Sequence, residues 1–349
     1  MPRTIGRNGS PYTRAAMLGG FAALVARDEA GAMDLLNRAG IPARALADPD
    51  MLISWTAVGD LMEAVAARLG KPCLGLEWAQ STPDPFLSFG PLALLAQFHG
   101  TLGEWCTASR DYWRYHTNAY GVELLDPGDG EDAVLRFWAS DMVPPSPHQI
   151  ELTIGGTCMM LRELAEFDDR GFVLVRFQHL APPDPSCHER LFRCPVEFGA
   201  CHNELVFRRA LHELPIRPPA GHLERYVAAR TSAVPGFDAS ARAMVEAMVP
   251  CFVGTRYCTL AHVAELLSMN PKKLQRALAR QGTHFAALVD KVRERMARQL
   301  LVDTDVPVAK IAGLLGYATT PPFTVAFRRW AGTSPREFRK GCMPAARPL

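Results

Sequence analysis

Residues 259–282 (TLAHVAELLSMNPKKLQRALARQG) constrain the fold more than any other stretch of the chain. Apolar residues recur at helical spacing over 260–267, which predicts a first short helix. A tight turn through Ser268 follows, and Asn270 can cap a second helix that has Pro271 at its first position, where a missing N–H costs no hydrogen bond. Two short helices joined by a tight turn form a helix-turn-helix, in which the second helix can enter a DNA groove.

The outer face of this second helix is polar and cationic. Leucines at helical spacing face inward, which leaves the opposite face to Lys272, Gln275, Arg276 and Arg280. Arg can pair with guanine edges in the major groove, and Gln with adenine edges. We therefore predict that Lys272, Gln275 and Arg276 contact bases, with a solvated helix face as the alternative.

The same pattern recurs after one long helix. Residues 284–301 predict a helix that spans roughly 30 Å, and 308–315 predict a short helix that stops at Gly316. A cap at Thr319 or Thr320 can then begin another helix. Two such readers about 34 Å apart match one turn of B-DNA, so a single chain can contact two successive major-groove segments.

Residues 240–340 resemble the DNA-binding domain of the AraC/XylS family of bacterial transcription regulators. The resemblance rests on NPKKLQRAL, on the long helix and on VAKIAGLLGYATTPPFTVAFRRWAGTSPREFR, whose ending from Phe323 to Arg339 is long and specific. It implies seven helices with two helix-turn-helix units. It also implies a regulator that binds double-stranded operator DNA, works with RNA polymerase and acts as an activator, as the family tends to do.

The resemblance assigns base-facing positions in the second unit as well. These positions hold Thr319, Thr320, Pro321, Pro322 and Val325. The family often has Arg where this chain has Val325, and neither Val325 nor Pro322 can donate a hydrogen bond to a base. Both can touch thymine methyl groups, or the unit can mainly grip phosphates. We expect sequence reading to be concentrated in the first unit. The expected phosphate contacts are Arg280, Arg298, Lys310, Arg328 and Arg329.

The charge of the chain is divided unevenly along its 349 residues. The net charge is +2, but residues 251–349 hold 16 Lys and Arg against 6 Asp and Glu, a balance of +10. The remainder therefore has 22 against 30, a balance of −8. A basic domain joined to an acidic one fits a polyanion-binding module attached to something else. A membrane-surface role is disfavoured because the basic residues alternate with apolar positions of a compact domain.

The first part of the chain predicts a mixed α and β fold. Helical patterns dominate as far as residue 118, and short aromatic and β-branched segments follow at 134–138, 172–177 and 204–208. We predict an α+β domain over 1–214, a proline-rich linker over 215–237 and an all-α DNA-binding domain over 238–342.

Segment 15–214 resembles the arabinose-binding-like regulatory domain of the ornithine- and virulence-regulator branch of the same family. The residues that carry this resemblance include NRAGIPARALADPDMLIS and FGPLALLAQFHGTLGEWCTASRDYW. It implies a domain that senses a small-molecule effector of unknown identity, forms a homodimer, or does both. Control by a protein partner or by thiol redox state is the alternative.

An aromatic cluster in this segment is a candidate effector pocket. Small-molecule pockets are largely apolar with a few polar groups. The candidate lining is Trp105, Tyr112, Trp113, Tyr115, His116 and Tyr120, with Trp138, Arg176 and His179 as a polar fringe. Core packing of a helix against the sheet is the alternative.

The nine cysteines are odd in number and scattered, and no export signal or run of about 18 apolar residues accompanies them. We interpret them as reduced thiols of a cytoplasmic protein that does not span a membrane. Cys187-His188, Cys194 and Cys201-His202 invite a zinc interpretation, but their spacing is not that of a C-x-x-C knuckle, so small buried thiols are favoured. A redox-sensing pair stays an alternative. We expect no metal and no cofactor.

No enzyme motif is visible. G-x-S-x-G, H-E-x-x-H, the phosphate-binding loop and a glycine-rich dinucleotide turn are all missing from the sequence. We therefore predict no catalytic residues. A ligand-processing enzyme fused to a DNA-binding domain is the less favoured alternative.

Overall fold

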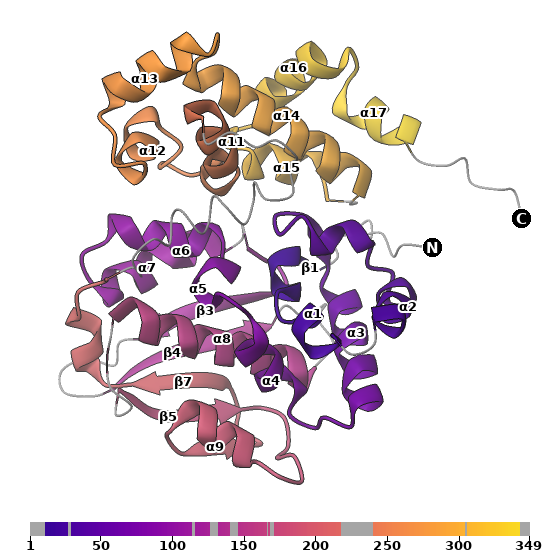
Figure 1. Cartoon of the computed structure of the whole chain (residues 1–349), viewed down its shortest axis with the longest axis vertical. Helices are drawn as coiled ribbons and strands as arrows, with labels where there is room; N and C mark the ends of the chain where they lie inside the picture. Colours follow the sequence, from indigo (N-terminus) through magenta and orange to yellow (C-terminus); the bar gives the residue numbers. More distant parts are fainter. Residues whose placement is uncertain are drawn as a thin grey trace, which may run out of the picture. The chain divides into compact units, whose positions relative to one another are not determined.

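The computed structural model describes residues 11–26, 29–113, 116–125, 132–139, 146–165, 167, 171–217, 240–303 and 306–342 (Figure 1). The chain divides into two compact units, with described residues 11–217 in the first and 240–342 in the second. Most of the predicted linker lies outside the described residues, so its boundaries stay a prediction. None of the described helices is long and apolar enough to cross a membrane.

The N-terminal unit contains a five-stranded mixed sheet. Its strand order is β3-β4-β7-β5-β6, with β5 and β6 parallel and the other pairs antiparallel. The strands are β1 (Tyr12–Arg14), β2 (Leu52–Ser54), β3 (Tyr120–Leu125), β4 (Ala133–Ala139), β5 (Phe172–Phe177), β6 (Val196–Phe198) and β7 (Asn203–Phe207). Central β7 is buried along its whole length, as expected for a strand covered on both faces. Strands β1 and β2 form a separate antiparallel pair.

Helices fill the rest of this unit. They are α1 (Phe21–Leu24), α2 (Glu29–Ala39), α3 (Trp55–Leu69), α4 (Leu74–Ser81), α5 (Pro85–Ser88), α6 (Pro91–Leu95), α7 (Leu102–Tyr112), α8 (Pro147–Ala165) and α9 (Ser186–Phe192). Short 3-10 helices lie at η1 (Ala15–Leu18), η2 (Ala43–Leu46), η3 (Ala96–Phe98) and η5 (Arg209–Glu213). Ser54 caps the start of α3, because its Oγ accepts a hydrogen bond from Ala57 N at 3.3 Å.

Helix α8 is the central helix of the N-terminal unit. It packs against α3, α4, α5 and α9, and thirteen of its residues are buried. At Gly75 in α4 an added Cβ would lie 2.3 Å from the backbone oxygen of His148. This distance is too short for any side chain at position 75. The close approach of α4 to α8 therefore requires glycine at this position.

The C-terminal unit is all-α and has seven helices in its described part, which confirms the predicted fold class. They are α11 (Ala241–Phe252), α12 (Leu260–Leu266), α13 (Pro271–Arg280), α14 (Phe285–Asp303), α15 (Val308–Leu314), α16 (Thr320–Ala331) and α17 (Pro335–Cys342). Helix α14 packs against α11, α15, α16 and α17. Fully buried Leu274, Leu278, Phe323 and Phe327 hold α13 and α16 by their inner faces.

The thiol prediction is wrong for two of the nine cysteines. Cys73, which precedes α4, and Cys187 in α9 form a disulfide across 114 residues of sequence. The packing of α4 against α8 and α9 brings them together, and no local pattern signals such a pairing. Burial raises the pKa of Cys106 and Cys158 to about 12 and that of Cys194 and Cys258 to about 11, so these four thiols form the reactive thiolate less readily than an exposed cysteine does.

Candidate nucleic-acid interface

Helix α13 presents an exposed cationic face. Its start is fixed by Asn270, whose Oδ1 accepts a hydrogen bond from Lys272 N at 2.9 Å, and by Pro271 at the first position. Ser268 in the preceding turn has a φ of 51°, a left-handed conformation that tightens the connection from α12. The predicted helix-turn-helix is thus formed from these local signals.

The predicted base-reading side chains are free to meet another molecule. Lys272, Gln275 and Arg276 are all exposed, and no hydrogen bond or ion pair engages their side chains within the described residues. Exposed Lys273, which the sequence analysis did not single out, and exposed Arg280 lie on the same helix. These five polar or cationic side chains, which make no side-chain hydrogen bond or ion pair with any residue that the structure describes, form a surface suited to base edges and phosphates.

Helix α16 presents a different face. Thr319 stands at the N-cap position, yet its hydroxyl makes no cap hydrogen bond, so this exposed group is left for another partner. Pro322 is exposed, Thr320 is half-buried, and Val325 is 70% exposed. An apolar side chain at a reading position can touch a thymine methyl group but cannot accept or donate a hydrogen bond.

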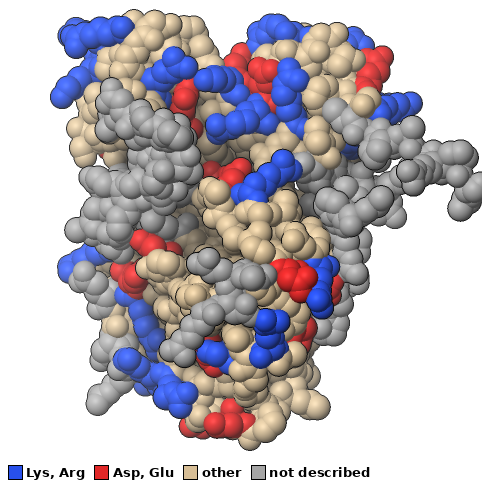
Figure 2. All heavy atoms as spheres, turned by 45° about the vertical axis from the view of Figure 1, so that its right-hand side comes forward, with Lys and Arg blue, Asp and Glu red and all other residues tan. Residues whose placement is uncertain are grey.

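Four of the five predicted phosphate contacts are exposed, and the fifth, Arg298, is engaged by residues of its own unit. Arg280, Lys310 and Arg328 are exposed. Arg329 is also exposed, but its Nη2 lies 2.5 Å from Asp290 Oδ2 on α14. In the view of Figure 2, Lys and Arg side chains gather on the surface of the C-terminal unit, with some acidic groups among them.

Arg298 is engaged inside its own unit. Its Nη2 donates to the Trp330 carbonyl oxygen at 3.0 Å, its Nε donates to Glu294 Oε1 at 2.9 Å, and its guanidinium lies 5.3 Å from the centre of the Phe338 ring. Arg293 similarly donates to the carbonyl oxygen of Leu315, at the end of α15. Cations at helix C-termini satisfy carbonyls that have no intrahelical partner.

The aromatic cluster of the N-terminal unit is mostly core. Trp105 and Trp113 are 2% and 5% exposed, and Trp105 Nε1 donates to the Leu92 carbonyl oxygen at 2.9 Å. Trp113 contacts His116 and Tyr120, with ring centres 5.9 Å and 5.7 Å apart. Trp138, by contrast, is 54% exposed. The side chain of Tyr112 and all of Tyr115 lie outside the described part.

The cavity beside His116 is small. It measures about 40 Å³ and is also lined by Phe89, Tyr120 and Thr153, so it has room for ordered water but not for a metabolite. Burial, together with the charge of Arg14, lowers the pKa of His116 to about 3, and its Nδ1 has no hydrogen-bond partner within the described residues. The ring is therefore neutral at physiological pH.

A larger cavity lies elsewhere in the same unit. It measures about 360 Å³ and is lined by residues of α1, α2 and α3 and by the segments that follow α1 and α3. Most of the lining is apolar, including Leu24, Leu35 and Val65. Of its two cationic residues, Arg68 and Lys71, the latter forms an ion pair with Glu77. Its volume lies in the range of small-molecule sites. Sequence reasoning missed it, because short apolar helices give no signal for a gap between them.

Two family models match the chain. Residues 31–216 match the arabinose-binding domain of AraC transcription regulators, and residues 263–341 match a helix-turn-helix domain. The chain belongs to the AraC family of transcription regulators. Both resemblances drawn from the sequence are thereby confirmed, and the chain is a DNA-binding transcription regulator.

Relatives of this AraC-type chain match it along nearly its whole length. The transcriptional regulator VirS of Mycobacterium tuberculosis is 26% identical and matches 93% of this chain and 96% of its own. The ornithine utilization regulator of Pseudomonas aeruginosa is also 26% identical, matching 91% and 93%. Among solved structures, the regulator CdpR of Pseudomonas aeruginosa covers 88% of this chain and 96% of its own, with 22% identity and a TM-score of 0.39. All three are named as regulators.

Proposed function

We propose that this AraC-type regulator is an activator that reads DNA sequence mainly through its first helix-turn-helix. The contrast between α13 and α16 supports the assignment of base reading, whereas the activator role follows the tendency of the family. Lys272, Gln275 and Arg276 on α13 are exposed and capable of hydrogen bonds to bases, whereas Pro322 and Val325 on α16 offer only apolar contact. The second unit then grips phosphates through Arg328 and Arg329, with Thr319 and Thr320 at its base-facing edge.

Binding-site selection from random duplex DNA tests this assignment. The full-length chain should enrich one site, and Arg276→Ala should weaken binding to that site by about 1–3 kcal/mol and relax preference at one base pair. Lys273→Ala is the matched control on the same helix. We assign a phosphate contact to exposed Lys273, and loss of such a contact weakens binding to all sequences about equally. Equal base preference in the two halves of the selected site would contradict reading by the first unit.

The N-terminal unit supports the regulatory half of the proposal. We infer that it binds a small-molecule effector in the 360 Å³ cavity. We also propose that the chain forms a homodimer and acts in the cytoplasm, at promoters, together with RNA polymerase. The mostly apolar lining favours an effector that is largely apolar. An effector changes activity only if it binds the active and inactive arrangements with different affinity.

Thermal melting of the full-length chain against a panel of metabolites tests effector binding. A true effector should raise the melting temperature, and Val65→Trp, which fills the cavity from α3, should abolish that rise. Control of the unit by thiol redox state is the second candidate function, because the Cys73–Cys187 disulfide provides an oxidisable pair. A melting temperature that responds to reductant and to no metabolite would favour this candidate.

A further inference from the structure

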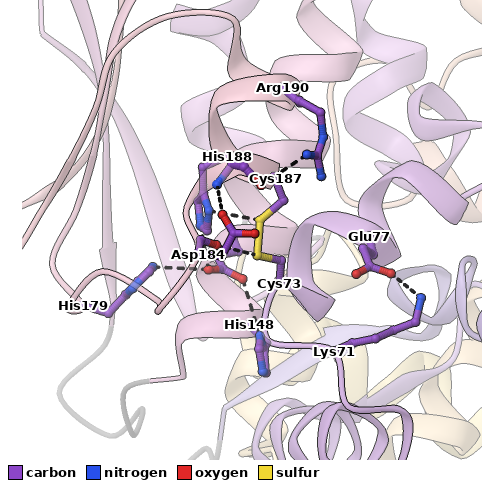
Figure 3. Close-up of a disulfide and its surroundings, with 11 residues drawn as sticks. Lys71, Cys73, Glu77, His148, His179, Asp184, Cys187, His188 and Arg190 are labelled. Carbon is purple, nitrogen blue, oxygen red and sulfur yellow. Dashed lines mark hydrogen bonds and ion pairs between the residues drawn. A yellow bond between two sulfur atoms is a disulfide. The ribbon is translucent and has the colours of Figure 1, made fainter.

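Cys73, Cys187 and His188 place three potential metal-ligating atoms together. The two sulfurs and a ring nitrogen of His188 all lie within 4.8 Å of one another (Figure 3). They come from the start of α4 and from the first turn of α9, two segments far apart in sequence. Two thiolates and an imidazole are the ligand types that zinc prefers in proteins.

The orientation of His188 supports a ligand role. His188 is fully buried, and its Nε2 lies 2.8 Å from Glu151 Oε1 on α8. The rings of Phe177 and Phe198 meet it edge to face, with ring centres 5.6 Å and 5.0 Å away. A carboxylate on one ring nitrogen and aromatic rings on the flanks fix the imidazole and its tautomer, as outer partners do in metal sites.

The other ring nitrogen faces sulfur. When Nε2 carries the proton given to Glu151, the neutral ring has a lone pair at Nδ1, and this atom lies 3.3 Å from Cys187 Sγ. A disulfide sulfur has no proton to donate to that lone pair. Either a Cys187 thiol or a metal ion would satisfy it, so Nδ1 is the ring nitrogen that can serve as a metal ligand when the disulfide is reduced.

The spacing also suits a metal. Zinc bound to thiolate and imidazole holds sulfur and nitrogen about 3.6 Å apart, close to the 3.3 Å between Cys187 Sγ and His188 Nδ1. The Cα atoms of Cys73 and Cys187 are 6.6 Å apart, near the upper end of the disulfide range. Small side-chain rotations can therefore separate the sulfurs. Cys187 is half-buried, and Asp184 and Glu189 near it in sequence are exposed.

We propose that reduced Cys73 and Cys187, together with His188 Nδ1, form a binding site for a thiophilic divalent cation such as Zn²⁺, which the disulfide closes. A dithiol reductant supplies two electrons and two protons to the disulfide, which becomes two thiols, while the dithiol becomes a disulfide. The cation then displaces one proton from each thiol and binds both thiolates and the neutral imidazole. Glu151 orients His188 from outside the ligand set, and a water molecule completes a tetrahedral site.

Co²⁺ titration of the full-length chain tests the site. The chain is reduced with a dithiol, freed of it without oxygen, and titrated while absorption is recorded, because cobalt bound to thiolate in a tetrahedral site has distinctive charge-transfer and visible bands. We expect one Co²⁺ per reduced chain, displaced by one Zn²⁺, and no binding by the oxidised chain. Glu151→Gln should weaken Zn²⁺ binding by about 10- to 100-fold with the cobalt spectrum retained.

Matched variants decide the assignment. The double variant Cys73→Ser, Cys187→Ser should lose the cobalt bands, whereas Cys201→Ser, which removes an exposed free thiol, should keep them. Circular dichroism melts check that each variant folds. Bands of equal strength in the double variant would place the metal elsewhere and overturn the proposal. A reduced, folded parent chain without stoichiometric cobalt would also overturn it, leaving a thiol–disulfide pair without a metal.

Discussion

Arg280 and Arg298 should respond differently to salt when each is changed to Gln. The sequence predicts a phosphate contact for both. In the structure Arg280 is exposed on α13, whereas Arg298 donates to the Trp330 carbonyl oxygen and to Glu294. We therefore expect Arg280→Gln to reduce the salt dependence of DNA binding, and Arg298→Gln to leave it unchanged but to destabilise the C-terminal unit.

The magnitudes follow from counterion release and from the contacts of Arg298. Each phosphate contact contributes about 0.9 to the slope of log K against log salt, so raising salt from about 50 to about 200 mM should cost the parent about 3.5-fold more affinity than Arg280→Gln. Arg298 is 37% exposed at its side chain, so we expect its loss to cost only about 1 kcal/mol. For a domain of this size that lowers the melting temperature by roughly 4–8 °C.

Fluorescence anisotropy with a non-specific duplex measures both slopes, because phosphate contacts carry no sequence information. Arg38→Gln is the charge-matched control. It removes one exposed cation from α2, far from α13 in sequence and in the other unit, and should change neither quantity. A reduced slope for Arg298→Gln with an unchanged melting temperature would refute the reasoning.

Two further predictions concern stability. Gly316→Ala should lower the melting temperature of the C-terminal unit, because Gly316 has a φ of +81° and an added Cβ would lie 2.9 Å from Gly254 Cα; the left-handed backbone alone costs about 1–2 kcal/mol, and an unchanged melt would disprove the close packing. Glu204 is buried, which would raise its pKa, but hydrogen bonds from Arg176 and Arg136 outweigh burial and hold the pKa below 4.5. Its stabilisation is therefore present above pH 4.5 and lost as the pH falls through the lowered value. Glu204→Gln should cost about 1–3 kcal/mol at pH 7, and its unfolding curve should approach that of the parent in acid; a constant difference at every pH would contradict the assignment.

Local signals predicted the C-terminal unit well. The turn at Ser268, the cap at Asn270 and the glycine at 316 all lie where the sequence placed them, because each acts on its immediate neighbours. The first helix of the first helix-turn-helix was predicted over 260–267, and α12 spans Leu260–Leu266. Strands 134–138 and 172–177 were also found, as β4 and β5.

Features that depend on distant partners were not predictable in this way. The β1–β2 pair joins residues 40 positions apart, and β3 lacks the aromatic and β-branched run that marked the other strands. The Cys73–Cys187 pairing depends on how α4 meets α8 and α9. Likewise, helical spacing shows that Arg298 points away from the apolar stripe of α14. It does not show that Arg298 donates a hydrogen bond to the Trp330 carbonyl oxygen near the end of α16.

The length of α14 sets the distance and the rotation angle between α13 and α16, the second helices of the two helix-turn-helix units. Its 19 residues rise about 28 Å at 1.5 Å each, close to one repeat of B-DNA at about 34 Å. One residue added to or removed from α14 would turn α16 by roughly 100° around the helix axis relative to α13. On the promoter, the corresponding error is a half-turn insertion between the half-sites, which moves one of them to the opposite face of the duplex.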